Sequence, residues 1–182
     1  MPSLLVRLAG RSCFLEEGRR PRDARDEQDV EHALRAFALR ADRDDPTRLE
    51  AGISVYAVES AAEADDLVTE RAAYANLDRD PARVGHEDFV LVPARLVVEA
   101  GLVVEAIGDP EGATGRLRTQ HQELRLRPGV SNAEVAREEL EAALKRLAEL
   151  LLVELSREGG ADLLRRVVKT AIRARIERIA EG

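Results

Sequence analysis

The stretch SNAEVAREELEAALKRLAELLLVELSREGG, residues 131–160, decides how we read the C-terminal part of this chain. Ser131 and Glu134 have the S-x-x-E spacing of a capping box, in which the two side chains satisfy free N–H groups at a helix start. A long amphipathic run follows, and Gly159-Gly160 interrupts it before a second amphipathic run extends to Gly182. We therefore predict a C-terminal hairpin of two helices.

Each predicted helix carries a broad apolar stripe. Its members recur every three or four residues, which is the period of one helix face. On the two helices in turn they are Leu140, Leu144, Leu147 and Leu151, then Leu164, Val168, Ile172 and Ile176. Burying about six such side chains per helix contributes on the order of 20–35 kcal/mol before conformational entropy is subtracted. Such a surface must be covered.

Three coverings are compatible with the stripes. The hairpin can pack on the rest of the chain and complete the core of a monomer. It can instead serve a homo-oligomer or a partner helix, which binds along such an apolar face. A third arrangement lays the basic last helix on an anionic membrane or nucleic acid, and the absence of Trp counts against it.

The rest of the chain alternates between strand and helix patterns. Alternating or β-branched apolar residues predict strands, and apolar residues at helical spacing predict helices. The strands are expected at 4–8, 53–58, 89–92 and 120–127, and the helices at 27–39 and 60–75. This pattern predicts an α+β fold, with α/β as the alternative. We expect a small mixed sheet with flanking helices over residues 1–128 and the hairpin over 129–182.

One pentapeptide occurs twice in tandem. Leu-Val-Val-Glu-Ala fills both 96–100 and 102–106, with Gly101 between the copies. Pro93 suits the start of a helix and Gly101 its end. We therefore predict a helix for the first copy and a strand for the second. The alternative, two strands around a bulge at Gly101, is favoured by the Val-Val pairs.

The charge is distributed unevenly. The net charge is −7, yet residues 161–182 carry six basic and three acidic side chains, so this segment is +3 and the remainder is −10. A nucleic-acid partner is not expected, because phosphate contacts require a basic excess. A basic tail on an acidic body favours docking to an acidic surface, including the body itself.

Composition also bears on the compartment. Cys13 is the only cysteine, which fits a reducing environment. No stretch approaches the roughly 20 apolar residues of a membrane span, and Leu4–Val6 is too short for the apolar region of a signal peptide. High Ala, Arg and Glu content is typical of a GC-rich genome, so we expect a bacterial, cytoplasmic protein.

The candidate chemistry centres on His121 and Glu123. Two residues apart on a strand, they face the same side, where they could act as a general base and its orienting carboxylate or as two metal ligands. An ordinary solvated strand face is the simpler interpretation. His86-Glu87-Asp88 could contribute to a cation site or form a charged strand entrance. With three scattered histidines and one cysteine, we predict no metal site.

Arg40, Ser54, Tyr56 and Glu123 occur in this order along the chain. The order superficially resembles that of ADP-ribosyltransferase folds, where a basic residue, a strand hydroxyl and a late carboxylate surround NAD. The resemblance covers isolated residues rather than a motif, and we assign no family from it. It implies that Arg40 and Tyr56 join His121 and Glu123 as candidate catalytic residues.

Two functions from different classes follow. The first is a non-enzymatic accessory or regulatory protein that acts by self-association or partner binding through its C-terminal helices. The alternative is a small nucleotide-handling enzyme, ADP-ribosyltransferase-like or a hydrolase, that uses His121 and Glu123. The sequence identifies no cofactor, because the Gly-rich stretch 108–115 lacks both the Walker A and the G-x-G-x-x-G spacing.

Overall fold

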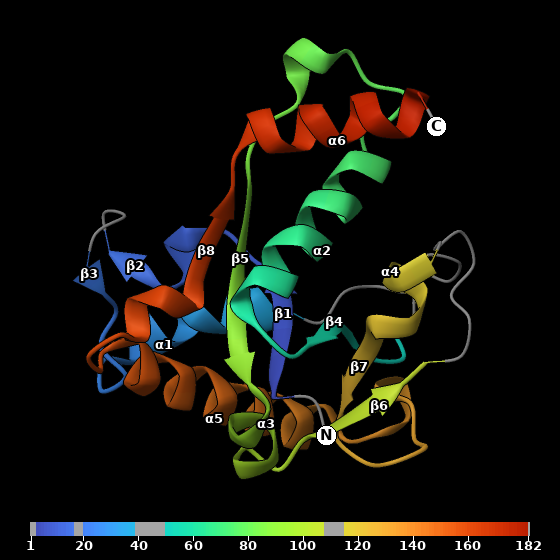
Figure 1. Cartoon of the computed structure of the whole chain (residues 1–182). Coiled ribbons are helices and arrows are strands. Elements are labelled where there is room, and N and C mark those ends of the chain that lie inside the picture. Colours follow the sequence, from blue (N-terminus) through green and yellow to red (C-terminus); the bar gives the residue numbers. More distant parts are fainter. Residues whose placement is uncertain (1–2, 17–19, 39–49, 108–114, 182) are drawn as a thin grey trace.

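The computed structural model describes residues 3–16, 20–38, 50–107 and 115–181. Within these ranges, six strands form one sheet in the order β6-β7-β4-β1-β5-β8 (Figure 1). Their bounds are β1 Leu4–Leu8, β4 Ile53–Val58, β5 Glu87–Pro93, β6 Val103–Ala106, β7 His121–Arg125 and β8 Leu164–Val167. Every neighbouring pair is antiparallel, so the sheet is not mixed as expected. The strand patterns could not set the strand directions, although the α+β class is confirmed.

Helices cover both faces of this sheet. A second, two-stranded sheet is formed by residues that follow β1 in the sequence. The small sheet pairs β2 Leu15–Glu16 with β3 Arg20–Pro21. The helices are α1 Glu27–Leu34, α2 Ala61–Tyr74, α3 Ala94–Glu99, α4 Gly115–Gln120, α5 Arg137–Leu155 and α6 Lys169–Glu181. Figure 1 shows α1, α3 and α5 on one side of the large sheet and α2 with α6 on the other.

The larger core lies on the side of α5, and we call it the α5-side core. Alternate residues of the central strands point to this side, as the period of a strand requires. It joins Leu5, Val55, Val90 and Leu124 of the sheet to Leu144, Leu147 and Leu151 of α5. The stripe predicted on the first long helix is therefore buried inside this chain.

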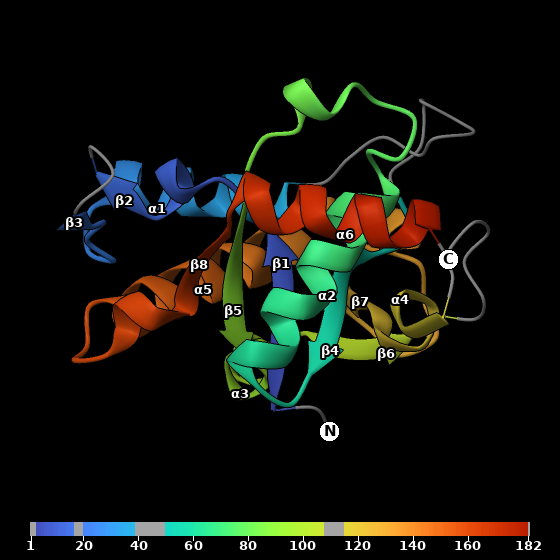
Figure 2. The ribbon, with the colours of Figure 1, turned by 45° about the horizontal axis from the view of Figure 1, so that its top comes forward.

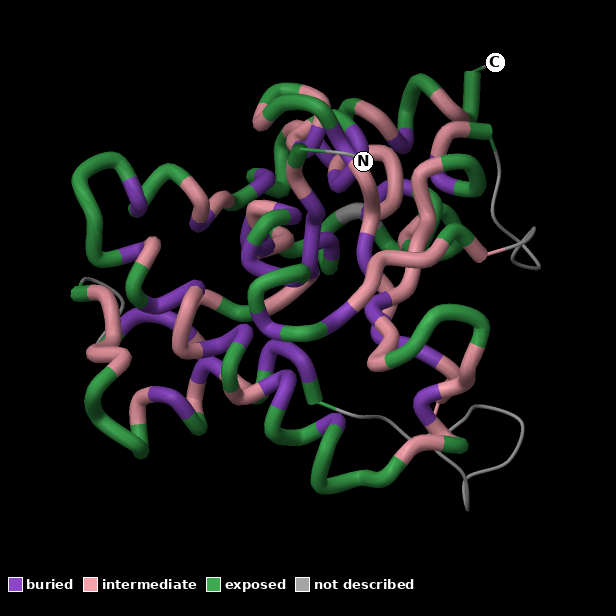
Figure 3. Tube along the Cα trace, turned by 90° about the horizontal axis from the view of Figure 1, so that it is seen from below, coloured by how far each residue is buried: buried purple, intermediate pink, exposed green. Residues whose placement is uncertain are grey.

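The opposite face carries the α2-side core. The intervening residues of the same strands, such as Val6, Phe89 and Leu91, pack here against α2 and α6. Figure 2 shows α6 lying across α2, and the two helices are in contact. Figure 3 shows the buried residues gathered in the middle of the molecule between these layers.

The tandem pentapeptide adopts two conformations, as predicted. The first copy forms most of α3, which begins directly after Pro93, and the second copy contains β6. Between them Gly101 has φ +82°, a left-handed conformation that only glycine adopts at no steric cost. The flanking Pro and Gly, rather than the shared residues, therefore decide the local structure.

The predicted C-terminal hairpin is wrong in its second half. Residues Gly160–Leu163 form a 3₁₀ turn, Leu164–Val167 form the edge strand β8, and α6 starts only at Lys169. Leu164 joins the α5-side core and Val167 the α2-side core, because side chains three apart on a strand point to opposite faces. The two long helices consequently lie on opposite faces of the sheet instead of against each other.

The predicted capping box is also wrong in detail. Ser131 caps a 3₁₀ turn, Asn132–Glu134, through a hydrogen bond from the Ala133 N–H, and α5 begins later at Arg137. The buried side chain of Asn132 accepts a hydrogen bond from the Leu126 N–H and donates one to the Leu124 carbonyl. These bonds hold the segment against the end of β7, and the long helix begins only at Arg137.

The basic C-terminal segment docks on the acidic body, as its charge favoured. Arg165 of β8 binds Asp65 of α2, with Nε 2.8 Å from Oδ1. Arg175 of α6 pairs with Asp66. Ion pairs of partly exposed groups each stabilise only weakly, but together they fix β8 and α6 on α2.

Candidate functional site

A cavity opens where β1 and β4 separate. β1 pairs with β5 as far as Leu8 and Phe89, whereas its pairing with β4 stops at Val6 and Tyr56. Beyond this point the ladder between β1 and β4 is absent within the described residues. The space left at this end of the sheet is the entrance to a cavity of about 620 Å³.

Arg7 fills the gap between the separating strands. Its Nε donates to the carbonyl of Ala36 and its Nη1 to the carbonyl of Ser54, both at 2.7 Å. The side chain is buried, and a buried guanidinium requires such acceptors because desolvation is costly. Arg7 therefore brings a fixed positive charge to the wall of the cavity.

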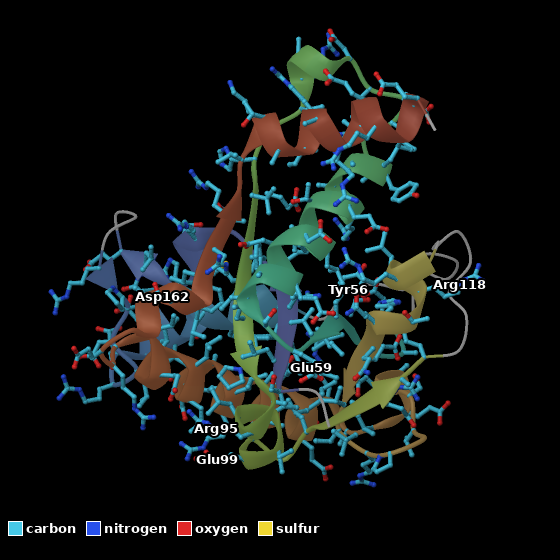
Figure 4. The ribbon with its side chains drawn as sticks, viewed as in Figure 1. Tyr56, Glu59, Arg95, Glu99, Arg118 and Asp162 are labelled. Atoms are coloured by element: carbon cyan, nitrogen blue, oxygen red, sulfur yellow. The ribbon has the colours of Figure 1, made fainter. Side chains whose placement is uncertain are left out.

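His121 and Tyr56 form the aromatic part of the wall. They are direct partners in the β4–β7 register, and their rings stack with centroids 5.1 Å apart and planes inclined by 26°. Figure 4 places Tyr56 on the α2 side of the sheet, whereas Arg95 of α3 lies on the other side. The structure therefore brings together two of the candidate catalytic residues.

The His121 imidazole is held in its neutral form. Burial lowers its pKa, Glu123 opposes this effect, and the charge of Arg71 lowers the pKa further. Its Nε2 is buried and has no hydrogen-bond partner among the described residues. Buried polar atoms in proteins are rarely left unpaired, so this nitrogen is free to form a further hydrogen bond.

Two further arginines line the cavity. Arg35, from the 3₁₀ turn Arg35–Phe37, has no ion-pair or hydrogen-bond partner of its guanidinium in the described part of the chain. Arg71 of α2 is held only loosely, with its Nη1 4.0 Å from Oε1 of Glu87. Both cations are therefore able to bind a negatively charged group that enters.

The acidic residues of the wall are partly neutralised. Asp88 binds Arg166 across the β5–β8 pair, with Nε 2.6 Å from Oδ1 and Nη2 2.9 Å from Oδ2. Burial alone would raise the pKa of Asp88, but the hydrogen bonds and charge of Arg166 hold it below the usual value. His86-Glu87-Asp88 thus forms the entrance of β5 and one side of the cavity.

The other two candidate catalytic residues do not line the cavity as described. The Glu123 carboxylate accepts hydrogen bonds from Arg125, whose Nη2 lies 2.8 Å from Oε2, and its side chain covers Gly52. It therefore influences His121 only by its charge. Arg40 lies outside the described residues.

Cys13 also lines the cavity. Burial raises the pKa of its thiol, and the charges of Arg35 and Arg22 only partly oppose this. The group is therefore a neutral thiol near pH 7 rather than a ready nucleophile. As the single cysteine of the chain, it provides a reporter inside the cavity.

The candidate interaction residues lie largely inside the molecule. Val168 is exposed, at 53%. The others are buried, namely Leu140, Leu144, Leu147, Leu151, Leu164, Ile172 and Ile176. The stripes on which we based self-association are thus covered by this chain itself.

Sequence reasoning missed the three arginines of the cavity. Arg7, Arg35 and Arg71 come from a strand, a 3₁₀ turn and a helix that are distant in sequence. For Arg7 the local pattern was misleading, because alternation with Val6 and Leu8 is typical of a residue on the polar face of a strand, whereas the structure buries it. For Arg35 and Arg71 no local signal exists.

No family model matches this chain, and no curated protein or solved structure is significantly similar to it. The described residues contain no group of three or more His, Cys, Asp or Glu that could hold a metal ion. Among them, too, no helix is long and apolar enough to cross a membrane.

Proposed function

We propose that this protein binds a small oxyanion-bearing molecule in the cavity between β1 and β4. The observation that carries the proposal is that one cavity is lined by both Arg35 and His121. Among the described residues, the Arg35 guanidinium and the buried His121 Nε2 have no partner. Groups left without partners in a native protein often mark the place of a ligand.

The charge of the wall favours an anion. Arg7, Arg35 and Arg71 supply three positive charges against the carboxylates of Glu87 and Asp88, and Asp88 is already paired with Arg166. A guanidinium presents N–H groups that match two oxygens of a phosphate, sulfate or carboxylate at once. In a recess with restricted water, such charges interact more strongly than on an open surface.

The size of the cavity favours a metabolite rather than a macromolecule. Its volume of about 620 Å³ falls within the roughly 300–1,000 Å³ range of small-molecule sites. A phosphorylated metabolite as large as a mononucleotide is compatible with this space. Tyr56 and His121 add a stacked aromatic wall.

Of the enzymatic hypothesis, this proposal keeps His121 as the residue in contact with the ligand, and it gives Glu123 an indirect role. A neutral imidazole can accept a proton and act as a general base, so His121 is the residue that would transfer protons to or from a bound substrate. Glu123 would act through its charge on His121, without touching the ligand. Self-association through the C-terminal helices receives no comparable support, because its stripe residues are mostly buried in the chain.

The rate at which N-ethylmaleimide alkylates Cys13 tests the proposal directly. We expect sulfate, inorganic phosphate or adenosine monophosphate to slow the reaction in a saturable way at constant ionic strength. Arg35→Gln should weaken this protection several-fold. The matched control is Arg95→Gln, which removes an arginine that binds Glu154 on the opposite side of the sheet (Figure 4).

Two results would contradict the proposal. One is an alkylation rate that no anion changes at millimolar concentration. The other is protection that Arg35→Gln and Arg95→Gln reduce to the same extent, since this would show general charge screening. Acetate, phosphate and the nucleotide, compared at equal ionic strength, then distinguish carboxylate from phosphate ligands.

A further inference from the structure

His121 is a titratable residue of the cavity wall, and burial lowers its pKa. Its ring is stacked on Tyr56, and its buried Nε2 has no partner in the part of the chain that the structure describes. A neutral imidazole carries only one N–H, whereas an imidazolium carries two. Protonation would therefore supply a hydrogen-bond donor at Nε2 whichever tautomer the free protein adopts.

We infer that the cavity takes up its oxyanion together with one proton, which His121 carries. This inference rests on the proposed function, namely that the cavity binds an oxyanion. Because an imidazolium only donates hydrogen bonds, proton uptake restricts the ligand to groups that accept them, such as phosphate, sulfate or carboxylate. Cations and neutral hydrogen-bond donors would not stabilise the imidazolium.

Burial is the main reason why the pKa of His121 is lowered in the free site, and the charged groups around it modify this effect. On its own strand Glu123 favours the proton, and Arg71 of α2 disfavours it. Tyr56 of β4 contributes a ring rather than a charge. The other titratable or charged groups of the wall are Arg7 of β1, Cys13 of the 3₁₀ turn Arg11–Cys13, Arg35, His86, Glu87 and Asp88.

An entering anion acts on the pKa of His121 in the opposite direction to burial. Its negative charge offsets Arg35 and Arg71 and favours the charged imidazole, so the pKa of His121 rises on binding. Between the pKa of the free state and the higher pKa of the bound state, binding takes up about one proton. Affinity should therefore increase as the pH falls through this interval, by at most about tenfold per pH unit, and level off below it.

Sulfate is the appropriate probe because it does not itself titrate between pH 5 and 9. The chain has three histidines, so three imidazole Cε1–H signals can be followed by ¹H NMR against pH. The variants His32→Gln, His86→Gln and His121→Gln assign them. We expect saturating sulfate to raise the pKa of His121 relative to sodium chloride at the same ionic strength.

Calorimetry provides a second measurement on the same protein. Titration of sulfate in two buffers of different ionisation enthalpy gives the number of protons taken up per ion. We expect uptake of up to about one proton in the wild type. His86→Gln, which changes the other histidine of the wall, should keep most of this uptake, and His121→Gln should lose it while sulfate still binds through the arginines.

The outcomes separate the two proposals. Binding of sulfate with an unchanged His121 pKa, or proton uptake that His86→Gln abolishes, would overturn this inference and leave the proposed function standing. If sulfate, phosphate and adenosine monophosphate all fail to bind, by calorimetry and by Cys13 protection, both proposals are overturned. Because the NMR titration uses the wild-type chain, the result does not depend on whether His121→Gln folds. His32, on the exposed face of α1 with Nδ1 2.7 Å from the Gln28 carbonyl, is the internal reference.

Discussion

Replacement of Asn132 by leucine should destabilise this protein more than any surface change of similar size. Asn132 is 1% exposed, and its side chain makes two hydrogen bonds to the backbone at the end of β7. Its Oδ1 accepts from the Leu126 N–H at 3.1 Å, and its Nδ2 donates to the Leu124 carbonyl at 3.0 Å. Leucine has a similar shape and can make neither bond.

The expected magnitude follows from the two backbone groups left unpaired. A buried polar group that loses its partner costs about 1–3 kcal/mol. Leu124 is itself buried and Leu126 half-buried, so water can restore only part of this loss. We expect Asn132→Leu to lower the free energy of unfolding by about 2–4 kcal/mol.

Urea unfolding followed by circular dichroism measures this change. With a slope of about 2 kcal/mol per molar urea, the midpoint should fall by roughly 1–2 M. The matched control is Asn76→Leu: its Nδ2 also donates to a carbonyl, that of Ala72 at 2.7 Å, but the residue is half-exposed. We expect less than about 1 kcal/mol there. Equal midpoints for the two variants would refute the reasoning.

Three further predictions concern the core, the loss of stability at low pH and the turn after α5. Leu147→Ala should lower the free energy of unfolding by about 2–5 kcal/mol in a urea titration, because the side chain is fully buried in the α5-side core. Asp88→Asn should flatten the loss of stability below about pH 4, measured by urea unfolding between pH 2.5 and 6. Arg166 lowers the pKa of Asp88 in the folded protein, although burial opposes this. The ionised carboxylate therefore stabilises the fold above the pKa of the unfolded state, and this stabilisation is lost as the pH falls through the pKa of the folded state. Gly160→Ala should lower the thermal midpoint, because its Cβ would contact the carbonyl oxygens of Glu154 and Leu155.

Each of these variants has a control within the chain. Val168→Ala removes an exposed side chain and should change stability by less than about 0.5 kcal/mol. Asp162→Asn removes the charge of an exposed carboxylate and is the control for Asp88→Asn. Gly159→Ala tests backbone strain alone, because its φ is +78° and a Cβ would meet open space. A smaller effect at Leu147 than at Val168 would place the long helix outside the core.

Local signals predicted the parts of the fold that local interactions determine. β1 and β4 have the bounds that their alternating apolar residues indicated. The two copies of the pentapeptide differ as Pro93 and Gly101 predicted. Ser60 caps α2 through the Glu63 N–H, as its S-x-x-E spacing required.

Long-range contacts decide the parts that the sequence misassigned. Leu164–Val167 fits a helix as well as a strand, and its pairing with β5, including Arg166 to Asp88, selects the strand. Ser131 likewise begins no long helix, because Asn132 is bound to β7. In each case the deciding partner is tens of residues away or on another element, where periodicity carries no information.

The candidate site shows the same division. Tyr56 and His121 were identified by residue type and strand position, and the β4–β7 register brings them together. Glu123 faces the same side of the strand as predicted, but Arg125 engages its carboxylate. A pattern of alternating residues does not show whether the Glu123 carboxylate binds His121 or Arg125.

The ion pairs of the structure show which of the basic residues are already bound within this chain. The basic C-terminal segment was expected to dock on an acidic surface, and Arg165, Arg166 and Arg175 bind aspartates of this chain. By contrast, Arg35 lies in a chain of net charge −7 without a partner of its guanidinium among the described residues. The same cavity is lined by His121, whose buried Nε2 has no partner in this part of the chain, and the proposed anion site is based on these two residues. The cavity between β1 and β4, rather than the most basic stretch of sequence, is therefore where a negatively charged ligand should be sought.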